Sequence, residues 1–453
     1  MTAVATVAAA PVQGAVRRRE KVTLAGVVLV ISVAAFEAIA VATTMPTVAH
    51  SLHGVNAFGW AFTAYLLADI VGLVDAGARS DRRGPASSLV GGLALFAVGL
   101  VVDGLAPTMP VFLVGRVLQG YGAGALIVAV YVLVARVFPE ERRPRVFAAM
   151  SAAWVVPALV GPAFAGGVTA TVGWRWVFLG IAPLAALGAV MLLPVVRTAG
   201  GGSEEHVRRL STGGAVVLAG GLAVAQASGQ RIAWWSPLLL IGALLMAWLP
   251  LRRFLPAGTM RLRAGLPTVI VLRGIYSIAF FGAEAYLPLT LTKLHAGSPA
   301  TVGIPLTLAA IGWATGSWLQ GRPQRPDQEA LLRNGFLIVG VAVAALVVVT
   351  FGAVSMWVAT PIWMLAGFGM GLGYPTVSLV VLRLSPEHEQ GANSAGLQVC
   401  DVIGGIVGVA IAATLVTAAG TSHLDLAMRI ADPVLATAAI AGVALSRRAV
   451  RSA

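Results

Sequence analysis

The sequence predicts an all-α protein that crosses a membrane many times, and three observations lead to that prediction. Of 453 residues, 58% are hydrophobic and only 11% are charged, and the mean hydropathy is +0.88. Soluble domains carry about 25% charged residues, so this composition does not describe one. The apolar residues fall in runs of about 20, which is the length that a helix needs to cross a bilayer. The basic residues gather in alternate connecting segments between these runs.

Fourteen apolar runs are expected to be helices, because a lipid-exposed backbone must satisfy its own hydrogen bonds. They lie at 22–49, 57–77, 86–105, 110–135, 146–170, 174–196, 211–229, 233–251, 266–292, 301–320, 332–351, 357–382, 391–418 and 427–446. The seventh and eighth runs are the shortest. A count of twelve that omits residues 211–251 also keeps both termini on one side. It would leave two strongly apolar runs as a cytoplasmic loop, so fourteen is the favoured count.

The basic residues predict the orientation. If both termini are cytoplasmic, 25 of the 31 lysines and arginines fall in cytoplasmic segments, four fall outside, and Arg116 and Arg273 lie within spans. This distribution obeys the positive-inside rule. The net charge of +13 is therefore a topology signal with possible contact to anionic lipid, and it does not indicate nucleic-acid binding. Residues 1–16 are small and uncharged and precede "RRREK" (17–21), which predicts a cytoplasmic tail and no cleaved signal.

Several functional classes have no support in the sequence. The single cysteine, Cys400, excludes an intrachain disulfide and a cysteine-rich metal site. No phosphate-binding loop, HExxH or GxSxG motif occurs, so neither a metal nor a catalytic nucleophile is expected. The chain is not expected to be an enzyme.

Six characteristic sequence stretches occur in order between residues 36 and 183. They are "FEAIAVATTMP" (36–46) with "WAFTAYLLA" (60–68), "GARSDRRGPASSL" (77–89), "LVGRVLQGYGAGA" (113–125), "PALVGPAFAGG" (157–167) and "WRWVFLGIAP" (174–183). Together they resemble the major facilitator superfamily, and within it the fourteen-span branch of drug:proton antiporters. The C-terminal half is similar mostly in hydropathy, through "GWATGSWLQGR" (312–322) and "GFGMGLGYP" (367–375).

The resemblance implies a major facilitator fold in which two six-helix bundles are related by a pseudo-two-fold axis. The expected parts are a tail (1–21), a first bundle (22–196), a linker (197–210), an extra helix pair (211–251), a linker (252–265), a second bundle (266–446) and a tail (447–453). Substrate would bind near mid-membrane between the bundles, and access would alternate by rocking. The resemblance also implies a proton gradient as the energy source, with no cofactor.

The resemblance assigns gating roles to two sets of residues. Gly77, Asp81, Arg82 and Gly84 match the motif that latches the inward-facing gate. An ion pair across an interface that opens and closes is physically plausible there, and a nearby helix N-terminus would also attract an anion. Pro157, Gly161 and Pro162 match the fifth-helix motif of exporters, in which prolines bend the helix and glycines admit a second backbone. A kinked packing helix without any export role is the alternative.

Six carboxylates lie in or at the edges of spans: Glu37, Asp69, Asp75, Asp103, Glu284 and Asp401. Asp75 and Asp103 are close to helix ends, which predicts solvated or capping roles. Asp401 could be either a packing partner or a proton site. Glu37, Asp69 and Glu284 are near mid-span, where an ionisable group is costly unless it faces a wet cavity.

These three acids and Arg116 are the candidate proton-coupling residues. A carboxyl group in an apolar site binds its proton tightly and releases it when a cation approaches, which is the exchange that an antiporter needs. The resemblance links Arg116 to proton movement, and a buried arginine needs a partner. Arg273 is placed to pair with Glu284 on the same helix face. No histidine is in the middle of a span, so a histidine relay is not expected.

The candidate substrate site consists of the same acids and nearby aromatic residues. It comprises Glu37, Tyr65, Asp69, Tyr276, Phe280, Phe281 and Glu284. Aromatic faces beside a carboxylate suit lipophilic cations, although such a stripe also suits simple packing.

The expected protein is a monomeric exporter of lipophilic cationic or zwitterionic compounds in a bacterial inner membrane. Its partners would be small-molecule substrate, protons and lipid. A metabolite facilitator or importer, and a membrane sensor or scaffold without transport, remain as alternatives. The fifth-helix motif argues against the first of these.

Overall fold

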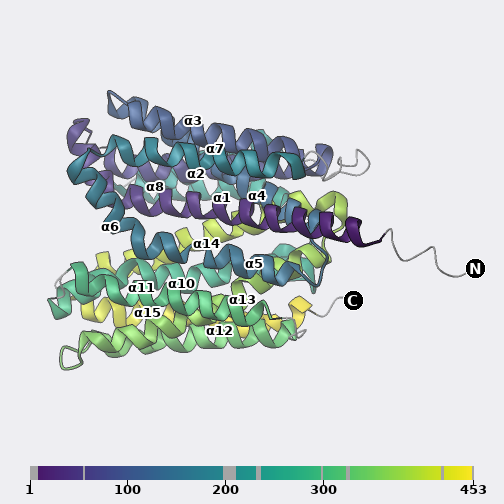
Figure 1. Cartoon of the computed structure of the whole chain (residues 1–453). Coiled ribbons are helices and arrows are strands. Elements are labelled where there is room, and N and C mark those ends of the chain that lie inside the picture. Colours follow the sequence, from purple (N-terminus) through teal and green to yellow (C-terminus); the bar gives the residue numbers. More distant parts are fainter. Residues whose placement is uncertain are drawn as a thin grey trace, which may run out of the picture.

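The computed structural model describes residues 9–54, 57–196, 211–230, 236–296, 299–322, 327–419 and 423–450. Within these ranges the chain is an assembly of long helices that run roughly parallel to one another, in two groups (Figure 1). The start of α1 and the end of α15 lie at the same end of the molecule, which we call the terminal side (Figure 1). The other end is called the opposite side.

The N-terminal group contains the first six predicted spans as seven helices. They are α1 (Ala9–Ser51), α2 (Phe58–Arg83), α3 (Pro85–Leu105), α4 (Met109–Val137), α5 (Arg143–Ala152), α6 (Val155–Thr171) and α7 (Arg175–Val196). The C-terminal group contains α10 (Leu266–His295), α11 (Pro299–Gln320), α12 (Gln328–Ala345), α13 (Ala359–Leu384), α14 (Gln390–Ala419) and α15 (Leu424–Val450). Short 3₁₀ segments at Leu346–Thr350, Met356–Val358 and Glu387–Glu389 extend α12, α13 and α14.

The fifth predicted span is broken, and its sequence explains where. Pro157 has no N–H group, so the carbonyl of Ala153 loses its partner within the helix. The chain turns at Ala153 and Trp154, between α5 and α6. The hydroxyl of Ser32 on α1 donates a 3.1 Å hydrogen bond to that Ala153 carbonyl. A polar side chain from another helix therefore satisfies the backbone group that the proline leaves free.

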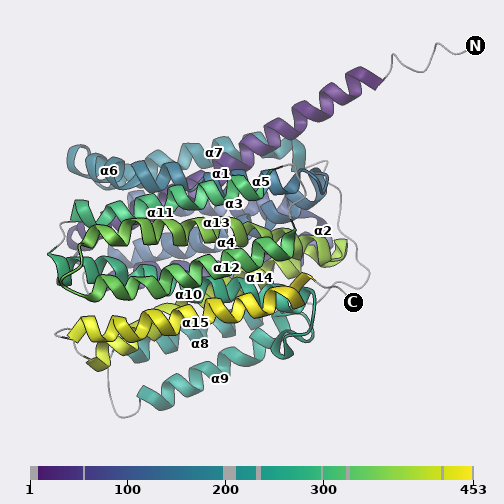
Figure 2. The ribbon, with the colours of Figure 1, turned by 90° about the horizontal axis from the view of Figure 1, so that it is seen from below.

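Twelve helices of the described residues are long and apolar enough to cross a membrane. The predicted count of fourteen is therefore not confirmed. The described residues of the region 211–251 nevertheless lie mostly in two helices, α8 (Thr212–Gln230) and α9 (Ser236–Phe254). The two helices pack together, and α8 lies against α2 while α9 lies at the periphery (Figure 2).

The interiors of the two groups are formed by α4 and α13, most of whose residues are buried. Glycines allow neighbouring helices to approach them closely: a Cβ at Gly122 of α4 would lie 2.7 Å from the carbonyl oxygen of Gly92 on α3. Small residues at such crossings let helices pack by close backbone contact inside a membrane. The packing leaves a large cavity between the two groups.

Candidate functional site

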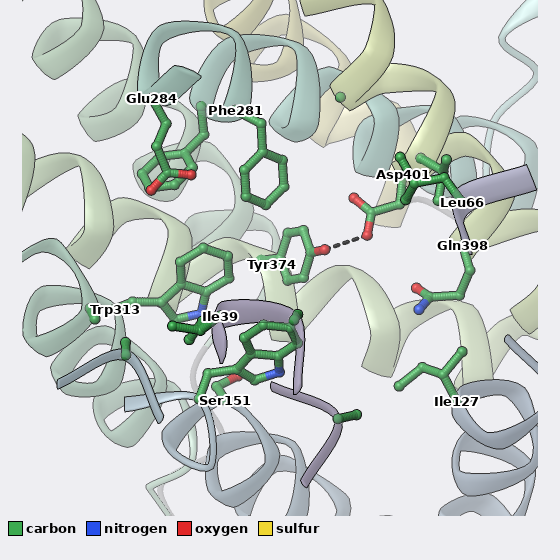
Figure 3. A pocket seen from close by; sticks show the side chains of 18 of the residues that line it. Ile39, Leu66, Ile127, Ser151, Phe281, Glu284, Trp313, Tyr374, Gln398 and Asp401 are labelled. Atoms are coloured by element: carbon green, nitrogen blue, oxygen red, sulfur yellow. Dashed lines mark hydrogen bonds between the residues drawn. The ribbon is translucent and has the colours of Figure 1, made fainter. Parts of the chain in front are cut away.

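The cavity between the two groups has a volume of about 1670 Å³ and is lined by both of them. Four charged residues of the described chain reach its wall: Asp69 of α2, Arg273 and Glu284 of α10, and Asp401 of α14. Most of the remaining wall is aliphatic or aromatic. Figure 3 shows Glu284 near Phe281 on one side of the cavity and Asp401 with Gln398 on the other.

Six residues from the predicted sets line this cavity. They are Tyr65, Asp69, Pro162, Phe280, Phe281 and Glu284. Within the described ranges, no side chain donates a hydrogen bond to the carboxylate of Asp69 or Glu284 or forms an ion pair with it. These two acids, one from each group, are therefore available to a molecule in the cavity.

Glu37 does not line the cavity, and the expectation that it does is wrong. Its side chain is fully buried and forms an ion pair with Arg116 of α4. Arg116 also donates hydrogen bonds to Gln119 and, over 3.0 Å, to the carbonyl of Ala61, and its guanidinium lies 4.5 Å from the centre of the Tyr65 ring. The predicted need of Arg116 for a partner is met here. The pair neutralises two charges inside the N-terminal group, where an unpaired charge would be strongly unfavourable.

Asp103 departs from its predicted role at a helix end. It is fully buried, and neither carboxylate oxygen has a hydrogen-bond partner among the described residues. One oxygen packs against Gly115, the residue that precedes Arg116. Asp75, in contrast, is paired: it accepts a hydrogen bond from Tyr121, forms a 2.6 Å ion pair with Arg79 and accepts a 3.2 Å hydrogen bond from Thr212 of α8.

The helix spacing predicted that Arg273 pairs with Glu284, and this prediction is wrong. Arg273 forms an ion pair with Asp401 at 3.3 Å instead. Its guanidinium stacks 3.2 Å from the centre of the Tyr374 ring. It donates to the Tyr374 carbonyl at 3.0 Å and to Gln398 at 3.2 Å. Asp401 in turn accepts a hydrogen bond from Tyr374 (Figure 3) and another from Ser277. Asp401 is therefore both an ion-pair partner and part of the cavity wall, and its role as a proton site stays a prediction.

Tyr276 lies outside the cavity, contrary to the prediction. Its side chain is fully buried within the C-terminal group, where its ring stacks on Phe336 at 3.7 Å. Its hydroxyl donates a 3.2 Å hydrogen bond to the carbonyl of Leu332. These contacts give Tyr276 a packing role.

The predicted gating motif joins the two groups at the terminal side. The Asp81 carboxylate of α2 accepts hydrogen bonds of 2.6 Å and 2.7 Å from the backbone N–H groups of Gly391 and Ala392. These residues form the first turn of α14, where free N–H groups and the helix dipole favour an anion. The helix N-terminus that was expected near this acid is therefore present.

The other residues of the gating motif have simpler roles. A Cβ at Gly77 would lie 2.8 Å from the carbonyl oxygen of Gly391, so this glycine permits α2 and α14 to touch. Gly84 has a φ of 80°, which allows the sharp turn from α2 to α3. Arg82 is exposed and donates to the Ala78 carbonyl of its own helix at 3.1 Å, so it does not bridge the groups.

Two further contacts close the terminal side. Tyr131 of α4 and Ser378 of α13 share a hydrogen bond of 3.1 Å, and Gly321 at the end of α11 lies against Ala148 of α5. In the other direction the wall continues to Ala418 near the end of α14 and to Gly303 near the start of α11. The cavity is thus closed at the terminal side and extends toward the opposite side.

Only one of the three predicted fifth-helix residues lines the cavity. Pro162 lines the cavity, whereas Pro157 is buried and defines the break in the span. A Cβ at Gly161 would lie 3.1 Å from a methyl group of Ile39, so this glycine allows α6 to approach α1.

Sequence reasoning missed several residues. Trp313 and Tyr374 line the cavity, and their rings meet edge to face at 5.1 Å. Asp432 of α15 is a seventh carboxylate, only 3% exposed, with one oxygen that has no partner in the described chain. Its position within an apolar run was the signal that could have identified it.

Two helical groups around a central cavity that is closed at one end define a membrane transporter. The sequence profile of the Major Facilitator Superfamily matches residues 27–409, and the chain belongs to that family. Its members are transporters and not enzymes, and the chain is a multi-pass membrane transporter of small molecules.

Relatives and solved structures agree with this assignment. The chain is 25% identical to multidrug resistance protein 3 of Bacillus subtilis over 426 residues, which cover 89% of this chain and 81% of the relative. It is 28% identical to a probable multidrug-efflux transporter of Mycobacterium tuberculosis, over 87% of this chain and 88% of that one. The crystal structure of the human organic anion transporter MFSD10 superposes with a TM-score of 0.71 at 15% identity, covering 94% of this chain and 99% of that one. The proton:xylose symporter XylE gives a TM-score of 0.66 at 16% identity, covering 92% and 94%.

Proposed function

We propose that the chain is a proton-coupled antiporter that exports lipophilic cations or zwitterions by alternating access. The observation that carries this proposal is a pair of carboxylates, Asp69 and Glu284, which lie on opposite groups in a largely apolar cavity and have no side-chain partner within the described ranges. Each carboxylate can hold either a proton or the positive charge of a substrate, but not both at once. This competition couples the movement of protons to the movement of substrate. The multidrug relatives support export as the direction.

The setting of this activity belongs to the same proposal. The protein would act as a monomer in the inner membrane of a bacterium, with both termini in the cytoplasm and no cofactor other than the proton gradient. The terminal side is then the cytoplasmic side, and the geometry described above is an outward-facing one. The pair α8–α9 would be the additional spanning pair of the fourteen-span branch, packed beside α2.

A transport assay in sealed vesicles tests the proposal. The full-length protein is reconstituted, a pH gradient is imposed in either direction, and movement of tetraphenylphosphonium is followed with an ion-selective electrode. We expect tetraphenylphosphonium to enter the vesicles when their interior is more acidic than the medium, because protons then leave as the substrate enters. This uptake should be lost in Asp69→Asn and Glu284→Gln. Transport that ignores the pH gradient would favour a facilitator, and absence of transport in the native protein would favour a sensor or scaffold.

A further inference from the structure

The two central helices carry the same glycine pattern and make the same kind of contacts. In α4 the sequence is Gly120-Tyr-Gly-Ala-Gly124, and in α13 it is Gly367-Phe-Gly-Met-Gly371. Gly120 and Gly124 pack on the backbone of α2, and Gly367 and Gly371 pack on the backbone of α11. These contacts establish that α2 and α4 correspond to α11 and α13.

The correspondence matches Arg116 with a tryptophan. Arg116 lies four residues before Gly120, and Trp363 lies four residues before Gly367. Glu37 of α1 and Glu284 of α10 are separated by the same number of residues as Arg116 and Trp363, so these two acids also correspond. Each of them is followed by an alanine. The acid is thus present in both halves, whereas the arginine is present only in the first.

The region around Trp363 lacks the polar groups of its counterpart. Gln119, which accepts a hydrogen bond from Arg116, corresponds to Ala366. Trp363 is fully buried and stacks on Phe280 with a ring separation of 4.7 Å, and its indole nitrogen has no partner within the described part of the chain. Among the described residues, no cationic side chain therefore pairs with Glu284 as Arg116 pairs with Glu37.

We propose that Glu284 recognises a substrate through a guanidinium or amidinium group, which pairs with Glu284 from the cavity as the Arg116 guanidinium pairs with Glu37 inside the first group. This inference rests on the proposed transport function and specifies its substrate class. Glu37 is neutralised within the protein, while the Glu284 carboxylate is left open to the cavity.

The surroundings of Glu284 suit a flat cation with an aromatic body. A planar guanidinium can form two parallel hydrogen bonds to one carboxylate, which a compact ammonium cannot do. Phe281 and Trp313 line the same cavity, and both pack edge to face against Phe280 at 5.4 Å and 5.6 Å. Their rings provide apolar surface for the body of the substrate and favourable faces for its charge.

The test is isothermal titration calorimetry on the detergent-solubilised full-length protein with phenylguanidinium and its uncharged isostere, phenylurea. We expect phenylguanidinium to bind about tenfold or more tightly than phenylurea, because hydrogen bonds to charged groups are the stronger ones. Glu284→Gln should remove this preference. Asp425→Asn is the control, because Asp425 pairs with Arg429 at 3.4 Å and does not line the cavity.

A second variant recreates the internal arginine of the first half. In Trp363→Arg the introduced guanidinium should pair with Glu284, so that phenylguanidinium binding is lost although the carboxylate remains. If Trp363→Arg fails to fold, Glu284→Gln still decides the question. A folded Trp363→Arg protein with unchanged phenylguanidinium affinity would contradict the inference.

Tetraphenylphosphonium separates failure of this inference from failure of the proposed function. If it binds and requires Glu284, but phenylguanidinium binds no better than phenylurea, the guanidinium specificity is wrong and the cation exporter remains. If neither cation binds the native protein, both proposals are overturned.

Discussion

The carboxylate of Asp81 and the backbone N–H of Gly391 are joined by a 2.6 Å hydrogen bond that connects the two helical groups. Together with the bond from Ala392, it fixes an acid of α2 on the first turn of α14. Because these bonds break when the groups separate, their energy contributes directly to the balance between closed and open forms of the terminal side.

We expect Asp81→Asn to shift this balance toward the open form. Hydrogen bonds to a charged group are worth about 1.5–3 kcal/mol each, so losing the charge should change the ratio of forms by about tenfold or more. Spin labels at Arg82→Cys and Glu387→Cys, in a Cys400→Ser background, report the separation by double electron–electron resonance. Both labelled residues are exposed at the terminal side.

Asp327→Asn is the matched control for this measurement. Asp327 also accepts a hydrogen bond from a backbone N–H at a helix start, that of Glu329, but it lies within one group. An equal change of the label separation in both variants would show that the Asp81 contact does not hold the groups together.

Glu37→Gln should lower the stability of the protein, whereas Glu284→Gln should leave it nearly unchanged. Glu37→Gln leaves the buried Arg116 without its ion-pair partner, which should lower the free energy of unfolding by about 3–5 kcal/mol. Glu284→Gln removes an unpartnered carboxylate that faces the cavity and should leave the melting temperature close to that of the native protein. Thermal unfolding in detergent, followed by tryptophan fluorescence, measures both.

The double variant Glu37→Gln/Arg116→Gln tests the cause of that loss. It should recover part of the stability, because no isolated charge remains buried. If the double variant is less stable than Glu37→Gln, the effect does not come from an unpaired arginine.

Gly124→Ala should destabilise the N-terminal group. A Cβ at this position would lie 2.8 Å from the backbone nitrogen of Leu73, so α2 and α4 would have to separate, at a cost of about 1–3 kcal/mol. Gly166→Ala is the comparison, since nothing lies within 4 Å of a Cβ at that position. Equal melting temperatures for the two variants would contradict the close approach of these helices.

Gly77→Ala should weaken closure without changing a charge. The added methyl group would meet the carbonyl oxygen of Gly391, where the closed form brings α2 against α14. We expect the same spin labels to show a larger open population than in the native protein. Gly91→Ala on α3 has open space at its Cβ and should not change the distribution of distances.

The helices were predictable because each one follows from a local property, a run of apolar residues long enough to cross a bilayer. The break at Ala153 also has a local cause in Pro157, and the sequence analysis recognised the bend but not the break. Whether α8 and α9 cross the membrane depends on more than their apolar sequences, and the count of fourteen stays a prediction.

The partners of the charged residues were less predictable, because tertiary packing selects them. Arg273 was matched with Glu284 on its own helix, but the packing of α10 against α14 brings Asp401 to it instead. Asp103 is near the end of its helix, yet α4 covers it. Glu37 and Arg116 were both recognised as buried charges, but only the structure pairs them with each other and separates Glu37 from the cavity.

The ion pair between Glu37 and Arg116 has a consequence for the order in which the protein is assembled. The two residues are 79 positions apart, and at about 5–20 residues per second the ribosome needs about 4–16 s to add the second after the first. During this interval the first helix carries a carboxyl group without its partner. Stable lateral release of α1 into lipid is therefore expected to wait for α4, so that the N-terminal group leaves the insertion machinery as a unit.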